Sequence, residues 1–396
     1  RRHPRRGVLA RPAPLRATYR HPDAAAYRAA GGAWDRPSLD ELVSGTARQT
    51  RMPLLVDDSG AALDGPALET AVASLAGGLR AAGVRHGDVV AWQAPNWHEV
   101  VVLYRACWRL GAIAGPIHHQ AGPADVDTLL KVLAPRLWLP RDEIRGPDAR
   151  DPDLLDGAPV TRSAAKPHDL AVALFTSGST GKPKAALHTQ RGLAYKAQVM
   201  AAAHQLTSDD AILMPAPLAH VSGLLNAVLV PGVVPMRVQL MERWEPEAAL
   251  ATIADAGITF MIGPPTFFIS LMEADGFRTD RVTSLRLVSS GGAGVTPAFV
   301  SDASARLDAT VKRTYGSTEA PTVTTSTPRD SAERARETDG RAVGAVQLRI
   351  SDSATGRPRG PGEVGELWLR GPELFVGYAD AAQTKAAIDG DRPEGE

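Results

Sequence analysis

An apolar run that ends in a cluster of glycines, hydroxyls and lysines constrains this chain more than any other feature. Leu170 to Phe175 is apolar and predicts a buried β-strand, and the next nine residues, Thr176 to Lys184, are Gly, Ser, Thr, Lys and Pro. Glycine allows backbone angles that other residues avoid, so successive N–H groups can point at one anion. Hydroxyl and ammonium groups add donors and positive charge. The sequence therefore predicts a strand that leads into a polyphosphate-binding loop.

Two other interpretations of this loop are a P-loop of the GTPase and kinase type and a flexible linker. A P-loop needs a longer spacing than the two residues that separate Gly178 from Gly181, and it continues into a helix. Pro183 follows Lys182, removes a backbone donor and blocks immediate helix entry. Flexible Ser/Gly linkers lack the Lys-Pro-Lys sequence and the flanking strand. Both alternatives are therefore disfavoured.

Length and charge limit the class of protein. At 396 residues the chain exceeds one ordinary core, so we expect about two or three subdomains. Its 44 Lys and Arg balance 44 Asp and Glu, so no global field favours nucleic acid as a partner. The longest apolar run, Leu224 to Val234, contains Pro231 and Gly232 and is shorter than the roughly 20 residues of a membrane span. We expect no transmembrane segment.

The cysteine content and the first residues bear on the compartment. Cys107 is the single cysteine, so it can form no internal disulfide, and its apolar neighbours predict a buried core residue in a reducing cytoplasm. Arg1 to Arg6 is followed by no apolar core of the signal-peptide type, and we expect a solvated tail there. A cytoplasmic location is the expectation.

Hydrophobic periodicity in the first part of the chain predicts an α/β unit. Residues 66–82 carry apolar side chains at helical spacing, and Asp88 to Trp92 reads as a strand. Glu99 to Leu110 predicts a second helix, and Ala112 to Ile117 a second strand. A strand, a helix and a strand at this spacing are typical of a parallel, doubly wound sheet. We assign residues 1–150 to this first α/β subdomain.

A second α/β subdomain is predicted over residues 151–339. The segment from Arg141 to Lys166 is rich in Asp, Pro, Arg and Gly and suggests a boundary before it. Its expected helices and strands are Gln190–His204, Ile212–Met214, Pro246–Ala256, Phe260–Gly263 and Leu285–Ser289. Residues 340–396 change to short alternating segments, Val346–Ile350 and Glu366–Arg370, between Gly/Pro turns, which predicts a small antiparallel β-unit.

Four further segments carry residues with recognisable chemistry. In the segment Tyr315 to Glu319 an aromatic ring can stack on a base, a hydroxyl can reach a phosphate and a carboxylate can hold Mg²⁺. Pro217 to Gly223 contains His220, and Ser289 to Ala293 is a turn of small residues. Gly362 to Gly371 lies in the β-unit. Taken singly, these segments are equally explained by ordinary strand-end turns, and His220 by a satisfied surface or core histidine.

Together with the loop, in this order, the segments resemble those of the adenylate-forming (AMP-binding) superfamily, in its acyl-CoA synthetase or fatty-acid-CoA ligase branch. The resemblance covers nearly the whole chain and is weakest before Arg85. It implies the large N-terminal domain of such an enzyme, with two doubly wound α/β subdomains and a small antiparallel β-unit. It also implies ATP-dependent activation of a carboxylic acid to an acyl-adenylate, followed by transfer to coenzyme A. The expected cofactors are ATP and Mg²⁺, with coenzyme A as co-substrate.

The resemblance also implies roles for individual residues. The expected groups are phosphate-binding Thr176, Ser177, Gly178, Ser179, Thr180, Gly181 and Lys184; adenine-binding Gly291, Gly292, Ala293, Tyr315 and Gly316; acyl-binding His220, Val221, Gly223, Phe267 and Gly292; catalytic Lys184, His220, Thr318 and Glu319; and metal-binding Glu319. Ala185 stands where the family usually has glycine. The family's ribose-binding Thr-Gly-Asp segment, hinge and C-terminal lid with its catalytic lysine would follow Glu396, so we expect a large domain without its lid that is poorly active in isolation.

Other functions within and outside the family stay open at this stage. An amino-acid adenylation domain is disfavoured because no acidic residue lies between Pro215 and Gln239 to bind a substrate ammonium group. An aryl-acid adenylation domain and a nucleotide-binding module without turnover are further alternatives. The expected pocket has no fixed charge and suits fatty, aryl or alicyclic acids. The sequence leaves the acid and the oligomeric state undetermined.

Overall fold

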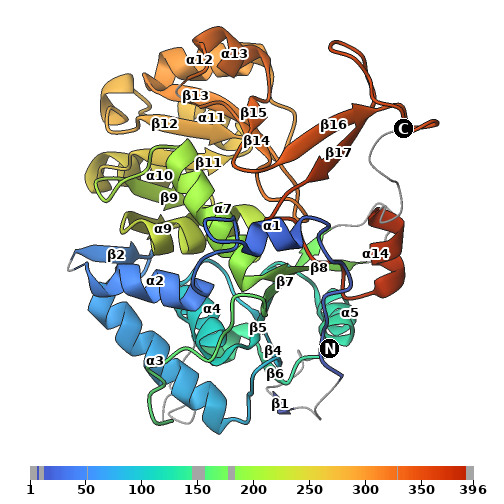
Figure 1. Cartoon of the computed structure of the whole chain (residues 1–396). Helices are drawn as coiled ribbons and strands as arrows, with labels where there is room; N and C mark the ends of the chain where they lie inside the picture. The colour runs from blue at the N-terminus through green and yellow to red at the C-terminus, as the bar shows by residue number, and fades with distance from the viewer. Residues whose placement is uncertain are drawn as a thin grey trace.

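The computed structural model describes residues 7–8, 13–50, 52–144, 157–176, 183–327 and 329–388. Their strands form a six-stranded sheet, a nine-stranded sheet and a two-stranded sheet. The six-stranded sheet has the order β1-β6-β4-β5-β7-β8, and the nine-stranded sheet β15-β14-β13-β12-β11-β9-β10-β2-β3. Figure 1 shows the two large sheets one above the other, with the small sheet to one side. The expected class, two α/β sheets and a small antiparallel unit, is confirmed.

Parallel strands form the centre of the six-stranded sheet. Strand β4 (Val89–Gln93) runs parallel to β5 (Ile113–Ile117) and to β6 (Leu137–Leu139). Strand β7 (Leu170–Thr176) lies parallel to β5, and β8 (Lys184–Thr189) pairs antiparallel with β7. The short β1 (Gly7–Val8) pairs antiparallel with β6 at the other edge. The predicted parallel, doubly wound pairing of the first two strands is confirmed.

Helices with clear start and stop signals pack near this sheet. In α3 (Gly65–Ala81) the side chain of Asp64 accepts a hydrogen bond from the backbone N–H of Ala67 and caps the first turn. Helix α4 (His98–Leu110) ends at Gly111, whose φ of 65° is left-handed. Cys107 is fully buried on α4, as the sequence predicts. The other helices of this part are α2 (Leu39–Arg48), α5 (Pro123–Leu133) and α6 (Arg141–Ile144).

The nine-stranded sheet also has a parallel centre with antiparallel edges. Its parallel strands are β2 (Pro53–Val56), β10 (Arg237–Leu240), β9 (Ala211–Met214), β11 (Phe260–Gly263), β12 (Leu287–Ser290) and β13 (Thr310–Tyr315). The antiparallel edge strands are β3 (Ala62–Asp64), β14 (Thr324–Thr325) and β15 (Arg341–Ala342). The accompanying helices are α7 (Gln190–Ala203), α8 (Val221–Gly223), the π-helix Leu224–Leu229, α9 (Val230–Val233), α10 (Pro246–Ala256), α11 (Pro265–Glu273), α12 (Pro297–Leu307) and α13 (Ala332–Glu337).

The sheets are not divided at residue 150. Val172 of β7 pairs with Ala114 of β5, so a strand after the expected boundary completes the first sheet. Leu55 of β2 pairs with Val238 of β10, so a strand before the boundary extends the second. The physical reason is that each open strand edge carries backbone donors and acceptors that need partners, whatever their distance along the chain. Segment 141–166 therefore lies between two strands of the same sheet, and the subdomain limits stay sequence-based predictions.

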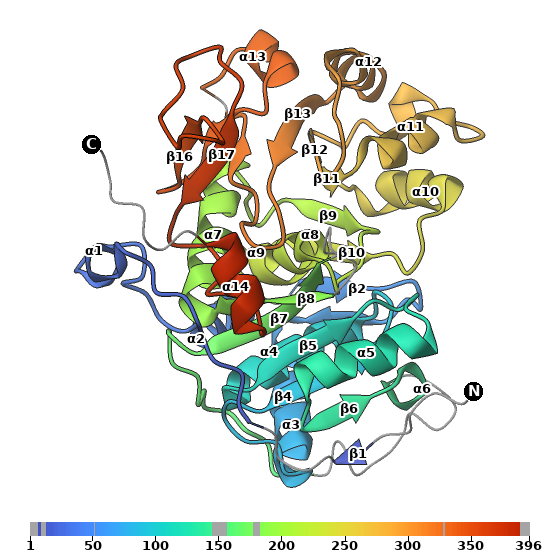
Figure 2. The same cartoon turned by 90° about the vertical axis from the view of Figure 1, so that its right-hand side faces the viewer.

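The last part of the chain returns to β8. Strands β16 (Gln347–Ser351) and β17 (Glu366–Arg370) form the expected antiparallel pair. The following segment then runs along β8: the N–H of Val376 donates to the carbonyl oxygen of Leu187 at 2.8 Å, and the N–H of Leu187 donates to that of Gly377 at 2.9 Å. Helix α14 (Ala381–Ala387) follows, and Figure 2 shows it beside β7 and β8. We call residues 372–379 the return segment.

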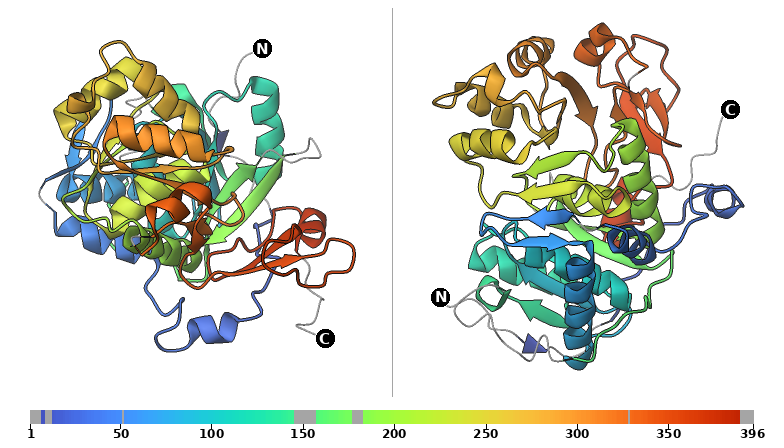
Figure 3. Two further views of the ribbon diagram at one scale, coloured as in Figure 1. Left: turned by 90° about the horizontal axis from the view of Figure 1, so that it is seen from above. Right: turned by 90° about the vertical axis from the view of Figure 1, so that its left-hand side faces the viewer.

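The N-terminal arm, residues 13–37, holds the return segment from the other side. The indole Nε1 of Trp34 donates to the carbonyl oxygen of Pro372 at 2.9 Å, and the N–H of Thr18 donates to that of Val376 at 2.9 Å. The short helix α1 (Ala24–Arg28) of this arm stands out from the body of the molecule (Figure 3). Residues far apart in the sequence are thus tied together next to β8.

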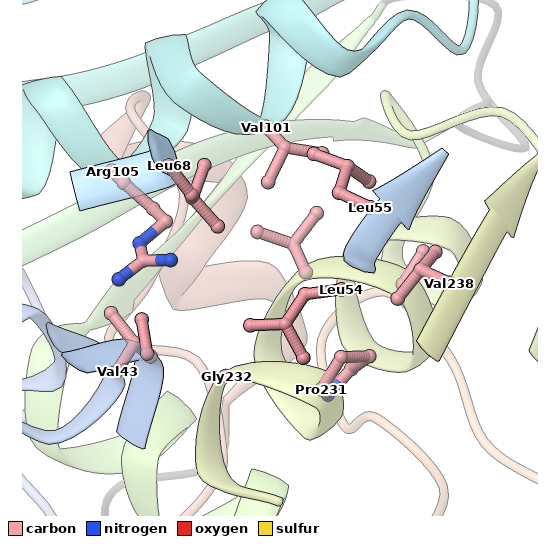
Figure 4. Close-up of a pocket in the computed structure, with 12 residues that line it drawn as sticks. Val43, Leu54, Leu55, Leu68, Val101, Arg105, Pro231, Gly232 and Val238 are labelled. Carbon is pink, nitrogen blue, oxygen red and sulfur yellow. The ribbon is translucent and has the colours of Figure 1, made fainter. Parts of the chain in front are cut away.

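A small cavity of about 20 Å³ lies between α2, α4, β2 and α9. Figure 4 shows Arg105 among aliphatic side chains such as Val43, Leu68 and Val101. The volume suits about one water molecule, so we assign this cavity no substrate. Arg105 and Arg109 belong to a buried ion-pair network with Asp40 and Glu69 that ties α2, α3 and α4 together. In the described residues, every helix is too short or too polar to span a bilayer.

Candidate active site

The carboxyl ends of β11, β12 and β13 meet at one edge of the nine-stranded sheet. Because these strands are parallel neighbours, their last residues and the turns after them lie side by side. Gly291 follows β12, and a Cβ there would lie 2.4 Å from the carbonyl oxygen of Thr314 on β13. At Gly316 a Cβ would lie 2.3 Å from the backbone nitrogen of Thr322. Close backbone packing therefore requires glycine at both positions, a role independent of any ligand.

The expected adenine-binding residues lie together at this edge. Tyr315 ends β13 and leaves 45% of its surface exposed, which is unusual for a large aromatic side chain. Gly292 has a φ of 75°, and open space surrounds the position of its absent Cβ. Gly291, Ala293 and Gly316 belong to the same two turns. An accessible ring beside small residues provides a surface on which a flat base can stack.

Glu319 is held by the return segment. The phenol of Tyr378 donates a hydrogen bond to Glu319 Oε1 at 2.6 Å, and the N–H of Phe375 donates to the Glu319 carbonyl oxygen at 2.9 Å. Burial and the adjacent Glu319 carboxylate raise the pKa of Tyr378, so its phenol stays protonated and donates. Among the described residues, Glu319 Oε2 accepts no side-chain hydrogen bond. An anionic oxygen that is fixed in place suits a hard divalent cation such as Mg²⁺.

Strand β8 connects the phosphate-loop hairpin to the same turn. His188 is buried, and burial lowers its pKa to about 4 despite the favourable contributions of Thr318 and Glu319. The neutral ring therefore donates a hydrogen bond from Nε2 to the carbonyl oxygen of Thr318 at 2.8 Å. Lys184 begins β8, and its Nζ lies 5.4 Å from the centroid of the Tyr378 ring. The structure thus brings Lys184, Thr318 and Glu319 into one neighbourhood.

The phosphate loop itself is only partly described. Thr176 and Lys184 face each other as register partners in the β7–β8 ladder. The intervening candidates Ser177, Gly178, Ser179, Thr180 and Gly181 lie outside the described residues, as does Lys182. The two ends of the loop are therefore adjacent, and the loop connects two antiparallel strands.

His220 lies near two further histidines. Its ring centroid is 5.3 Å from that of His118, and the rings of His118 and His119 stack at 4.6 Å. Burial and the two neighbouring rings lower the pKa of His118 to about 4, and burial also lowers the pKa of His220. His220 is neutral at physiological pH and exposes part of its ring. Gly223 follows in α8, where a Cβ would lie 2.2 Å from the carbonyl oxygen of Pro217.

The expected acyl-binding residue Phe267 packs with Trp244. Their ring centroids lie 4.7 Å apart in a stacked arrangement. A Cβ on Gly263 would lie 2.6 Å from Cδ2 of Phe267, so the ring lies directly against the end of β11. Phe267 and Gly292 therefore follow neighbouring strands, β11 and β12. Val221 begins α8 directly after His220.

Comparison with known proteins identifies the family. A family model described as AMP-binding enzyme matches residues 44–379. The chain belongs to the AMP-binding enzyme family. It is 30% identical to the medium-chain fatty-acid–CoA ligase of Escherichia coli K12 over 94% of this chain and 71% of that protein. It is also 30% identical to a feruloyl-CoA synthase from an Amycolatopsis species, over 86% of this chain and 72% of that protein.

Solved structures share the fold of this AMP-binding enzyme. Apo MatB from Rhodopseudomonas palustris matches with a TM-score of 0.81 at 24% identity, over 89% of this chain and 74% of that one. The inhibitor-bound N-terminal domain of FACL13 from Mycobacterium tuberculosis matches with a TM-score of 0.81 at 20% identity, over 89% and 94%. Identities this low establish the fold alone. The expected family resemblance and the large-domain fold are confirmed.

Several residues at the candidate site of this AMP-binding enzyme escape sequence reasoning. Tyr378 and His188 hold the Glu319 turn, and His118 faces His220, but none belongs to a segment that the sequence singles out. Asn96 donates from Nδ2 to the carbonyl oxygens of Met214 and Ala216, and its Oδ1 accepts from the Leu218 N–H, which fixes the segment before His220. The sequence offers one signal for these supporting residues: His188 is a polar residue within the apolar strand Lys184–Thr189.

Proposed function

We propose that this AMP-binding enzyme uses ATP to activate a hydrophobic carboxylic acid and then transfers the acyl group to coenzyme A. The acid's carboxylate oxygen attacks the α-phosphorus of ATP, an acyl-adenylate forms and pyrophosphate leaves. The sulfur of coenzyme A then attacks the acyl carbon, AMP leaves with the bonding electrons, and the thiol proton passes to solvent. Family membership and relatives that are named as CoA ligases support this reaction. The cytoplasmic location predicted from the single cysteine stays part of the proposal.

One structural observation carries the assignment of the site. Strand β8, which leaves the phosphate loop, is bonded through His188 to the carbonyl oxygen of Thr318, and the return segment that pairs with β8 is bonded through Tyr378 to Glu319. Strand β8, the return segment and the Tyr315 to Glu319 turn are therefore held together by partly buried hydrogen bonds. A nucleotide whose phosphates enter the loop would meet the carboxylate and the exposed aromatic ring at one place.

The phosphate-binding role rests on the chemistry of the loop. Backbone N–H groups of its glycines, its hydroxyls and the Lys184 ammonium would hold the β- and γ-phosphates, which leave as pyrophosphate. The residues in this role are Thr176, Ser177, Gly178, Ser179, Thr180, Gly181 and Lys184. Thr318 would contact the α-phosphate as charge moves to it. These groups act mainly by positioning and by offsetting negative charge.

Glu319 is the proposed ligand of Mg²⁺. The Tyr378 hydrogen bond fixes Oε1 of the Glu319 carboxylate. Because the carboxylate group is planar and rigid, the same bond also limits where Oε2 can lie. A bound Mg²⁺ would neutralise phosphate charge and polarise the phosphoryl centre. Tyr378 acts through Glu319 and is a positioning residue. Tyr315, with Gly291, Gly292, Ala293 and Gly316 beside it, is proposed to hold the adenine.

The proposed acid site has a neutral, largely apolar character. His220, Val221, Gly223, Phe267 and Gly292 supply the lining, and the stacked Trp244 and Phe267 add aromatic surface. The lowered pKa of His220 makes it a neutral hydrogen-bond donor or acceptor next to the acid's carboxylate. No acidic residue between Pro215 and Gln239 would balance a substrate ammonium group, which disfavours amino acids. Fatty, aryl and alicyclic monocarboxylic acids fit this description.

The proposal is tested by incubating the enzyme with ATP, Mg²⁺, coenzyme A and a panel of acids. Pyrophosphate release is followed, and adenylates are trapped as hydroxamates. We expect turnover with at least one fatty, aryl or alicyclic acid and none with free amino acids. Pyrophosphate exchange that depends on an amino acid would replace the proposal by amino-acid adenylation. ATP binding without exchange for any acid would leave a nucleotide-binding module instead.

A further inference from the structure

A second group of buried polar side chains lies away from the proposed active site, at the opposite ends of the same two strands. Leu287 and Thr310 begin β12 and β13, whereas Ser290 and Tyr315 end them. A cavity of about 340 Å³ is lined by the first residues of these strands, by the end of α7 and by the start of α13. Its polar lining includes His204, Arg286, Lys312, Ser326, Thr327 and Asp330. We call it the β13 cavity.

Lys312 is the buried cation of this cavity. Its side chain is 4% exposed, and its Nζ donates to the carbonyl oxygen of Ser326 at 2.9 Å and to that of Ala203 at 3.4 Å. Both partners are neutral, and none of the carboxylates in the described residues forms an ion pair with this ammonium. Burial and the nearby Arg286 lower the pKa of Lys312 to about 8, against a smaller opposing effect of Asp330, so the group is mostly charged at neutral pH. A buried charge without an ion-pair partner is costly.

The other charged groups around the cavity already have partners. Arg286 donates through Nε and Nη2 to the two carboxylate oxygens of Asp210, both at 2.8 Å. Asp330 accepts from the guanidinium of Arg341 and from the N–H of Thr327. The two charges within each of these ion pairs cancel, which leaves Lys312, among the described residues, as the one charge of the cavity without an ion-pair partner. The local excess is one positive charge.

Two neutral groups beside Lys312 have unused hydrogen-bonding capacity. His204 is 3% exposed, and neither of its ring nitrogens has a hydrogen-bond partner in the part of the chain that the structure describes. The hydroxyl of Ser326, which is 2% exposed, also lacks a partner there. Burial and the nearby Lys312 and Arg286 lower the pKa of His204 far enough that the ring is neutral and carries one N–H. Buried polar groups in native proteins are normally paired, so these two donors can each bond an acceptor atom of a ligand.

We propose that the β13 cavity binds a small organic monocarboxylate, whose charge is balanced by Lys312 and whose oxygens accept from His204 and Ser326. A single uncompensated ammonium matches a single negative charge. A phosphate dianion would leave excess negative charge next to the Asp330 carboxylate. Carbon atoms of Ala203, Leu287, Ala332 and Ala335 line the remainder and suit an apolar ligand body. The site is separate from the proposed ATP and acid site, and the proposal does not depend on that function.

The test measures the NMR signals of the His204 ring. The chain is labelled with ¹⁵N-histidine, the His204 ring signals are assigned by their loss in His204→Phe, and sodium benzoate or inorganic phosphate is titrated at pH 7. We expect a saturable shift of the His204 signals with benzoate. In Lys312→Met the benzoate concentration for half-saturation should rise at least about tenfold, since a charged hydrogen bond is lost. In Lys131→Met, which removes an exposed lysine on α5, it should stay unchanged.

Each other outcome overturns part of the proposal. No saturable shift with either anion would exclude the site, and a saturable shift with phosphate but not with benzoate would exclude the monocarboxylate. An unchanged benzoate midpoint in Lys312→Met would exclude Lys312 as the recognising charge. If Lys312→Met does not fold, Ser326→Ala replaces it, with an expected rise of about threefold for the loss of one hydrogen bond. Benzoate in the proposed acid site would leave the His204 signals in place, so the two sites are distinguished.

Discussion

The phenol of Tyr378 and the carboxylate of Glu319, 59 residues apart in the sequence, are joined by a hydrogen bond of 2.6 Å. Tyr378 belongs to the return segment, whose backbone pairs with β8, and β8 begins with Lys184. The position of the carboxylate is thus fixed relative to the phosphate-loop hairpin rather than relative to its own turn alone. The Glu319 carboxylate and the Lys184 ammonium of the proposed site are therefore both positioned by β8 and the return segment paired with it.

We predict that Tyr378→Phe lowers turnover by about fivefold to tenfold and raises the Mg²⁺ concentration for half-maximal rate. The phenyl ring keeps the packing, but Glu319 loses the donor that orients it, and a hydrogen bond to a charged group contributes about 1.5–3 kcal/mol. Pyrophosphate release at varied Mg²⁺ measures both effects. Tyr195→Phe is the control. The phenol of Tyr195, on α7, accepts a hydrogen bond from the Ala345 N–H at 2.6 Å, so this variant also removes one hydrogen-bonded hydroxyl. An equal loss in both variants would reduce Tyr378 to a structural role.

Glu319→Gln is predicted to reduce turnover by at least about tenfold with little change in stability. The amide keeps an oxygen that accepts from Tyr378 but removes the charge that would hold Mg²⁺. Turnover and the urea midpoint are measured together. Glu247→Gln, at an exposed position on α10, should retain the original rate. A Glu319→Gln variant with unchanged Mg²⁺ dependence would remove Glu319 from the metal site.

Lys184→Ala is predicted to raise the KM for ATP and to lower kcat, with a combined loss in kcat/KM of at least about tenfold. Its ammonium would offset phosphate charge in both the bound and the reacting state, and one lost charged hydrogen bond accounts for this size of effect. Steady-state kinetics at varied ATP give the two parameters. The exposed Lys131→Ala is the matched control. Unaltered kinetics for ATP would place the phosphates elsewhere.

Local signals in the sequence predict much of the fold. The helix expected over 66–82 is α3 at Gly65–Ala81, and the strand expected over Phe260–Gly263 has those limits in β11. Such elements depend on periodicity, caps and turn residues within a short window. The strand expected at Leu285–Ser289 begins at Leu287, which reflects the weaker end signals of short apolar strands.

Long-range pairing is what the sequence does not predict. Nothing in β2 indicates that it will join β10 in the second sheet, because an open strand edge accepts any strand that the chain can bring to it. The same limit applies at the candidate site. Its loop and turns are recognisable as segments, whereas Tyr378 and His188 support them through contacts that depend on the folded return segment.

Replacing His220 by alanine is predicted to change the preference among acids by at least about fivefold while the KM for ATP stays within about twofold. The imidazole is neutral and lies next to His118, on the proposed acid side of the site. The ratio of kcat/KM values for a short fatty acid and an aryl acid measures the effect. His168→Ala, whose ring is largely exposed, serves as the control. An altered KM for ATP with an unaltered acid ratio would contradict this role.

The neutral state of His188 leads to a prediction about acid stability. Its pKa is about 4 in the folded chain and about 6.5 when unfolded, so the unfolded state binds more protons between these values. Stability should therefore fall as the pH falls from about 6.5 to about 4, and His188 alone contributes about 3 kcal/mol to the loss, at 1.36 kcal/mol for each pKa unit. Charging the ring would also place a buried cation on β8, the strand that begins with Lys184.

His188→Gln should remove this part of the pH dependence and keep a donor, since the Gln amide nitrogen can occupy the place of Nε2 and bond the Thr318 carbonyl oxygen. Urea unfolding at pH 7.5, 5.5 and 4.5 gives the free energy of unfolding of each form. The wild type should lose about 2.5 kcal/mol more than His188→Gln over this range, while both are similarly stable at pH 7.5. His21→Gln, which also removes a buried histidine with a pKa of about 4, should flatten the stability profile comparably. Only His188→Gln should also change turnover at low pH, because His188 bonds Thr318 in the turn that carries Glu319 and His21 has no such contact among the described residues. Parallel loss of activity in both variants would contradict that link.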